Sequence, residues 1–251
     1  MIDGGLDFAF ICGEHMVLDS QQINHLCLFY RANGVVPIVR ISSPDPTEAT
    51  RALDLGAQGI VAPYVEEVAE VRKLVGAVRY RPLKGKQLQP ILAGEPLSGE
   101  YREFFERFNA DNFLIVGIES QTAYERFDAL TDVPGVDGIF LGPHDISVSV
   151  GYPEAWMRSE YLDLMKHCVV RARAKNLGAG VHLPTKLREV IRGRELVEMG
   201  MNWILDGADA TWAAQCFAER RAEFGVGEYR KDIPADATRI ASCSTVDFPG
   251  K

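Results

Sequence analysis

Two apolar runs in the middle of the chain decide the fold class. Residues 114–120 read LIVGIES, residues 138–143 read GIFLGP, and the segment between them carries a helical pattern. Both runs are apolar almost throughout instead of alternating with polar residues, which is typical of strands buried on both faces of a parallel sheet. A strand, a helix and a second strand joined by short connections predict a βαβ unit with a right-handed crossover.

The same alternation continues on both sides of this unit. Further strands are predicted at residues 7–12, 36–41, 59–64, 178–183 and 203–209, and helical patterns at 44–56, 65–75 and 161–176. This repetition indicates an α/β protein with a TIM-type (β/α)₈ barrel, whose usual length matches the 251 residues of the chain. We therefore assign residues 1–224 to one barrel domain, and residues 225–251, which lack periodicity, to an irregular or partly disordered arm.

The predicted strands number seven, whereas a closed barrel of this type has about eight. One explanation is a strand hidden in residues 79–113. The other, which we prefer, is that the chain lacks the first β/α unit of the barrel.

Composition excludes several functional classes. The net charge is -8, and no basic stripe with interleaved aromatic residues indicates binding to nucleic acid. No apolar stretch approaches the length of a membrane span, and the N-terminus does not resemble a signal peptide. The five cysteines are scattered without a paired motif, which favours reduced thiols and a cytoplasmic location.

Ionisable residues collect at the predicted carboxyl ends of the strands, where parallel barrels place their active sites. These residues are Glu14, His15, Arg40, Glu119, His144, Asp145, Asp206 and Asp209. A charge in an apolar strand is costly to bury unless it is paired or binds a metal. Two carboxylates on neighbouring strands, Glu119 and Asp145, would suit Mg²⁺ or Mn²⁺. The alternative is a buried ion pair between Glu119 and Arg40.

Other candidates have less support from the residues alone. His15 is either a general base or a structural histidine, and Cys12 beside it is a weak candidate for a nucleophile. Lys84 and Lys86 could attract an anionic substrate, or they could form a solvated basic turn. No lysine lies within a predicted strand, so Schiff-base chemistry is not indicated.

Several motifs together resemble one known family. GEHMVLD, PIVRI, GAQGIVAPYVE, VGIES and PGVDGIFLGPHDIS look like the HpcH/HpaI family of class II pyruvate aldolases, with a likeness from about residue 7 to about residue 215. This resemblance implies a (β/α)₈ barrel and a homo-oligomer, a trimer or a hexamer, often with an exchanged terminal helix. It also implies cleavage of a 4-hydroxy-2-oxo acid to pyruvate and an aldehyde through a metal-bound pyruvate enolate, with Mg²⁺, Mn²⁺ or Co²⁺ as the metal.

The resemblance carries roles onto matching positions. Glu119 and Asp145 look like the metal-binding carboxylates, and Arg40 looks like the arginine that stabilises the enolate oxygen. His15 looks like the base, acting directly or through water. The backbone amides around His144 and Asp145 would hold the carboxylate of the 2-oxo acid.

The chain departs from the family pattern at two positions besides the missing first unit. Cys12 stands where many relatives have an acidic residue that orients the histidine, and a thiol is a poor acceptor for that task. Gly117 stands where many relatives have glutamine. The smaller residue could enlarge the substrate pocket or admit a water, so we count Gly117 among the predicted substrate-binding positions.

Two other functions stay open on the sequence alone. One is a lyase that acts on a CoA thioester, as in similar citrate-lyase-like barrels. The other is a non-catalytic barrel subunit, suggested by Cys12 and by the open sheet edge that a missing unit would leave. The sequence does not identify the aldehyde product or distinguish among the candidate metal ions.

Overall fold

A computed structural model describes residues 5–224, and the arm expected at residues 225–251 lies outside the described residues. Seven parallel strands follow one another around a single sheet in sequence order, β1 to β7. The strands are β1 (Phe8–Cys12), β2 (Val36–Arg40), β3 (Gly59–Ala62), β4 (Phe113–Ile118), β5 (Gly138–Leu141), β6 (Gly178–Leu183) and β7 (Trp203–Asp206). All seven predicted strands are confirmed, and five of them (β2, β3, β4, β5 and β7) end earlier than predicted.

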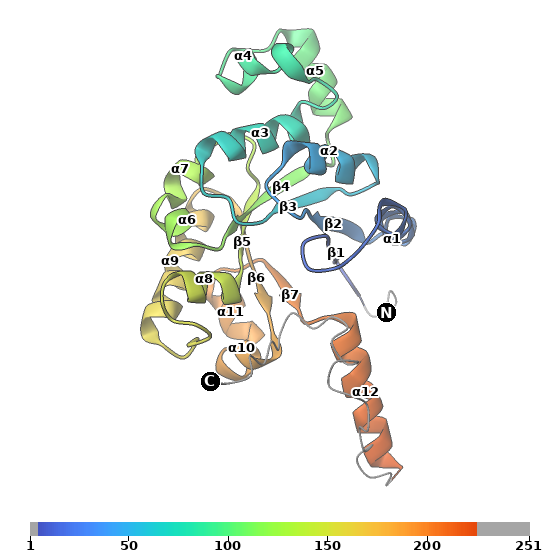
Figure 1. Cartoon of the computed structure of the whole chain (residues 1–251), viewed down its shortest axis with the longest axis vertical. Helices are drawn as coiled ribbons and strands as arrows, with labels where there is room; N and C mark the ends of the chain where they lie inside the picture. The colour runs from blue at the N-terminus through green and yellow to red at the C-terminus, as the bar shows by residue number, and fades with distance from the viewer. Residues whose placement is uncertain (1–4, 225–251) are drawn as a thin grey trace.

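Helices alternate with the strands and lie outside the sheet (Figure 1). They are α1 (Ser20–Ala32), α2 (Pro46–Asp54), α3 (Val68–Arg79), η2 (Gly85–Gln87), α4 (Gln89–Leu92), α5 (Gly99–Phe108), α6 (Gln121–Glu125), α7 (Phe127–Thr131), α8 (Pro143–Ser149), α9 (Ser159–Ala174), α10 (Thr185–Val190), α11 (Gly193–Met199) and α12 (Asp209–Glu223). Within residues 5–224, none of these helices is long and apolar enough to cross a membrane.

Two apolar layers hold the sheet in place. The larger layer lies between the strands and their helices, and strand residues such as Ile60, Leu114 and Val181 are fully buried in it. The smaller layer fills the inside of the sheet with Ile38, Val61, Ile115 and Phe140. Strands covered by apolar side chains on both faces explain why the sequence shows continuous apolar runs.

Aromatic rings fill the inside of the barrel where β1 and β7 come together without pairing. Trp203 stacks on Phe140 at 5.5 Å between ring centroids and meets the edge of Phe8 at 6.1 Å. A Cβ atom at Gly180 would lie 2.1 Å from the Trp203 ring, so only glycine leaves room for the indole there. The rings thus close the core across the unpaired edge.

The segment between α3 and β4 contains only helical elements, namely η2, α4 and α5. The alternative of a strand hidden in residues 79–113 is therefore wrong. The described chain forms a nearly closed barrel of seven strands, as expected if one β/α unit is missing.

Candidate active site

Arg40 lies at the mouth of the barrel, at the end of β2 beside the end of β1. The register of the two strands places Arg40 opposite Cys12. The guanidinium is buried, donates a hydrogen bond from Nη2 to Cys12 Sγ at 3.0 Å, and has Nε 3.1 Å from Glu14 Oε2. Burial alone would lower the pKa of Arg40, but Cys12, Glu14 and Glu119 together raise it above its usual value. Arg40 is therefore a fixed positive charge at neutral pH.

Glu119 follows β4 directly and is the most deeply buried acid at the mouth, with 2% of the residue exposed. Its Oε2 accepts a hydrogen bond of 2.7 Å from the backbone N–H of Tyr64, whose φ of 49° lies in the left-handed region. Its Oε1 is buried and has no hydrogen-bond partner. Burying a carboxylate oxygen without a hydrogen-bond partner costs free energy of folding unless a cation or another positively charged group binds it.

Two glycines make room for the carboxylate of Glu119. A Cβ atom at Gly117 would lie 2.7 Å from Oε2, and one at Gly142 would lie 2.3 Å from Oε1. The absence of a side chain at position 117 therefore gives space to Glu119 itself. That Gly117 also contributes to the substrate pocket stays a prediction.

The environment of Glu119 raises its pKa to about 7. Burial is the largest cause, and the negative charge of Asp145 adds to it, whereas the Tyr64 N–H and Arg40 act in the opposite direction. The charge of Asp145 therefore acts on Glu119, so the two predicted metal ligands lie within electrostatic range of each other. A divalent cation would stabilise both charges.

Asp145 and His144 lie in the first turn of α8, directly after β5. Asp145 is exposed, in contrast to Glu119. His144 Nδ1 lies 3.2 Å from Glu154 Oε1, while its Nε2 is buried without a hydrogen-bond partner. Sequence patterns did not indicate Glu154, because it lies in an irregular segment between α8 and α9.

Two further histidines lie at the mouth. His15, after β1, has Nε2 3.6 Å from Glu14 Oε2. His182, in β6, is half-buried, and its pKa is lowered to about 4 because burial and the positive charges of Arg40, His144 and His15 disfavour the imidazolium. His182 is therefore neutral at neutral pH.

The structure does not bring Lys84 and Lys86 to this mouth. Both are exposed around η2, which follows α3 after the chain has returned to the amino ends of the strands.

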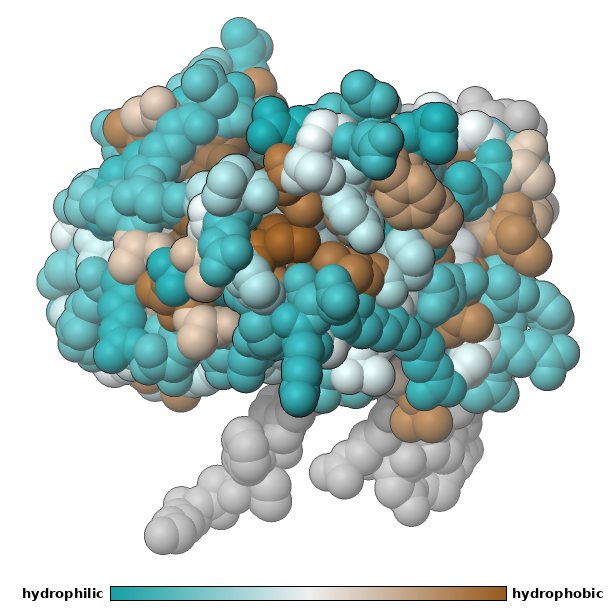
Figure 2. Space-filling model, turned by 90° about the horizontal axis from the view of Figure 1, so that it is seen from above, coloured by the Kyte–Doolittle hydropathy of each residue, from teal (hydrophilic) through white to brown (hydrophobic). Residues whose placement is uncertain are grey.

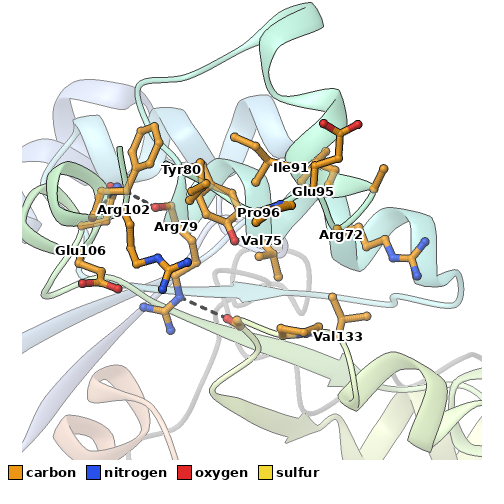
Figure 3. A pocket seen from close by; sticks show the side chains of 18 of the residues that line it. Arg72, Val75, Arg79, Tyr80, Ile91, Glu95, Pro96, Arg102, Glu106 and Val133 are labelled. Atoms are coloured by element: carbon orange, nitrogen blue, oxygen red, sulfur yellow. Dashed lines mark hydrogen bonds between the residues drawn. The ribbon is translucent and has the colours of Figure 1, made fainter. Parts of the chain in front are cut away.

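A cavity of about 720 Å³ lies at the same end of the barrel as these lysines, between α3, the α4–α5 segment and Val133–Gly135 (Figure 3). Figure 2, a view from above, shows apolar side chains gathered near the middle of an otherwise mainly hydrophilic face. Active sites of parallel barrels lie at the other end.

Within residues 5–224 no cluster of three or more histidine, cysteine or acidic side chains forms a complete metal site. Two carboxylates are nevertheless enough for Mg²⁺ or Mn²⁺, because such cations keep several waters or take oxygens from the substrate. The unpartnered Glu119 Oε1 and the glycines around it fit a cation bound at this point. The residues present are therefore compatible with the predicted metal.

Comparison with known proteins identifies the family. A sequence model described as HpcH/HpaI aldolase/citrate lyase matches residues 5–211. The chain belongs to this family. The family description names aldolases and citrate lyases, which are carbon–carbon lyases, and this chain is an enzyme of that kind.

Individual members of the HpcH/HpaI family resemble the chain over most of its length. The 2-keto-3-deoxy-L-rhamnonate aldolase of Salmonella gallinarum is 28% identical over 88% of this chain and 81% of its own. The crystal structure of an HpcH/HpaI aldolase from Desulfitobacterium hafniense has a TM-score of 0.72 and 24% identity, covering 93% of this chain and 87% of its own. The citrate lyase beta subunit of M. tuberculosis, complexed with oxaloacetate and magnesium, has a TM-score of 0.51 and 14% identity, covering 80% and 82%.

Proposed function

We propose that the chain cleaves a 4-hydroxy-2-oxo acid reversibly into pyruvate and an aldehyde, with the help of a divalent cation. The observation that carries this proposal is the buried, partly unpartnered carboxylate of Glu119, which lies near both Asp145 and Arg40. Carboxylates for a cation next to a fixed guanidinium suit a reaction in which negative charge develops on an oxygen. The similarity to 2-keto-3-deoxy-L-rhamnonate aldolase supports a 2-oxo acid as substrate.

Four residues at the mouth have a part in this proposal. Glu119 and Asp145 would hold the cation, which supplies a Lewis acid for the 2-keto oxygen. His15 removes the proton of the C4 hydroxyl, directly or through water. The C3–C4 bond then breaks, its electrons form the enolate of pyruvate, and Arg40 stabilises the negative oxygen. Protonation at C3 completes pyruvate, and the aldehyde leaves.

The test is an assay of pyruvate release from a panel of 4-hydroxy-2-oxo acids, with Mg²⁺, Mn²⁺ or Co²⁺ and with a chelator. We expect release that depends on the cation and stops when the chelator is added. Release from a CoA thioester, with no reaction on the panel, would favour the citrate-lyase-like function. No reaction on either class would favour a non-catalytic barrel.

Cation binding should depend on pH because the proton on Glu119 competes with the metal. With a pKa of about 7, Glu119 is mostly protonated below this pH and ionised above it. We expect affinity for Mn²⁺, measured by calorimetry, to rise about tenfold per pH unit below this pKa and to level off above it. Affinity that stays constant through neutral pH would show that Glu119 is already ionised or does not bind the metal.

Helix α12, the last helix within residues 5–224, indicates a partner chain. Helix α12 extends away from the barrel (Figure 1) and has no buried residue. Trp212, Phe217 and Phe224 are exposed on or beside it, with 70% of Phe217 accessible. We propose that α12 packs against a second copy of the chain, as the exchanged terminal helix of the family would.

Replacing Phe217 by glutamate should dissociate such an oligomer, because the charge would be buried in an apolar contact. Sedimentation velocity should show an assembly for the wild type and a smaller species for Phe217→Glu. Glu219→Gln, a mild change on the same helix, is the control and should leave the assembly intact. A wild-type monomer would refute the proposed exchange.

A further inference from the structure

One acidic side chain lies between the two predicted catalytic groups His15 and Arg40. Glu14 Oε2 is 3.1 Å from Arg40 Nε and 3.6 Å from His15 Nε2. The exposed fraction of these side chains rises from 10% for Arg40 to 24% for Glu14 and 36% for His15. A single carboxylate oxygen therefore joins a buried guanidinium to a more exposed imidazole.

Cys12, which stands where relatives have an acidic residue, makes different contacts. Its Sγ accepts a hydrogen bond from Arg40 Nη2 at 3.0 Å and another from the backbone N–H of His15 at 3.3 Å. These contacts hold the guanidinium and the chain after β1, but they do not involve the imidazole ring. The thiol therefore does not fulfil the orienting role that the acidic residue has in relatives.

His15 needs some group to orient it if it acts as a base. The fixed positive charge near His15 is that of Arg40. A histidine ring is usually fixed by a carboxylate or carbonyl that accepts from its second nitrogen, and such a contact is often long before substrate binds. Among the described contacts of the His15 ring, the carboxylate of Glu14 is the group at suitable distance.

We propose that Glu14 is the positioning residue that orients His15 and couples it to Arg40, in place of the acidic residue absent at position 12. This inference rests on the proposed function, because it assigns a partner to the base of that reaction. In this role Glu14 acts through the two side chains beside it, Arg40 and His15.

The kinetic test uses Glu14→Gln, Cys12→Asp and the double variant. Removing an orienting carboxylate typically lowers activity by roughly 10–100-fold, so we expect Glu14→Gln to reduce kcat by that factor with little change in KM. Cys12→Asp should restore much of the loss when combined with Glu14→Gln, because it returns a carboxylate next to Arg40 and the His15 turn. Glu160→Gln, an exposed change on α9, is the matched control and should leave kcat unchanged.

A second measurement does not need turnover. The ring nitrogens of His15 can be followed by NMR on protein labelled with ¹⁵N-histidine. We expect Glu14→Gln to shift the His15 resonances, whereas Cys12→Ser, which keeps a hydrogen-bond acceptor, should shift them much less.

The two measurements separate failure of this inference from failure of the proposed function. A wild type without aldolase activity, but with His15 resonances that respond to Glu14→Gln, would refute the function and retain the contact. An active wild type whose kcat and His15 resonances are both unchanged in Glu14→Gln would overturn the inference. An unchanged melting temperature of Glu14→Gln is required to exclude misfolding as the cause of lost activity.

Discussion

Glu119→Gln should abolish pyruvate release, with a loss of at least about 10³-fold, while the protein stays folded. Removing one donor or ligand that stabilises developing charge commonly costs roughly 10²–10³-fold, and loss of the cation would also remove its Lewis acid. Glutamine has nearly the shape of glutamate, so it should fit the space left by Gly117 and Gly142. Steady-state assays at saturating Mn²⁺ measure the effect.

The stability of Glu119→Gln provides an internal control with a definite sign. The carboxyl of Glu119 has a pKa of about 7 in the folded protein and an ordinary value of 4.5. Between these two values the folded state binds more protons than the unfolded state, so the stability of the metal-free protein falls as pH rises through this window. Glutamine does not ionise, so the Glu119→Gln variant does not lose stability in this way as pH rises. Above the upper value, the metal-free variant should melt at the same temperature as the wild type or higher.

A destabilised Glu119→Gln protein would contradict this interpretation, because it would mean that the charge of Glu119 supports the fold. That result would favour the buried ion pair with Arg40, which we considered on the sequence alone. Breaking a buried ion pair by removing one partner is typically destabilising by about 3–5 kcal/mol. The two roles of Glu119 thus predict opposite changes in melting temperature.

Arg40→Ala should lower kcat by roughly 10²–10³-fold, because it removes the fixed positive charge that stabilises the enolate oxygen. Binding of Mn²⁺ should persist, since the two proposed ligands remain. Arg40→Lys should recover only part of the activity, because an ammonium does not reproduce the contacts of the guanidinium with both Cys12 and Glu14. An Arg40→Ala protein with undiminished turnover would remove Arg40 from the mechanism.

Much of the fold could be predicted because it depends on residue patterns along the chain. Strands buried on both faces give continuous apolar runs, and charged residues interrupting these runs drew attention to Arg40 and Glu119. Both lie buried at the mouth. The strand boundaries were predicted less accurately. Strand β4 was predicted to end at residue 120 and ends at Ile118, and β7 was predicted to end at residue 209 and ends at Asp206.

Other features depend on contacts between residues far apart in the chain. The Tyr64 N–H reaches Glu119 because the backbone at Tyr64 adopts a positive φ, and no sequence motif signals this for a tyrosine. Trp203 fills the barrel over Gly180, a packing detail that strand patterns do not encode. Lys84 and Lys86 looked suitable for anions from their charge alone, but the path of α3 carries them to the opposite end.

The central claim is that Glu119 and Asp145 together bind one divalent cation. Electron paramagnetic resonance of Mn²⁺ titrated into the wild type, Glu119→Gln and Asp145→Asn tests this claim directly. We predict one tightly bound Mn²⁺ per wild-type chain, and only free Mn²⁺ with either variant. Equal binding of Mn²⁺ by all three proteins, or no binding by the wild type, would contradict the account.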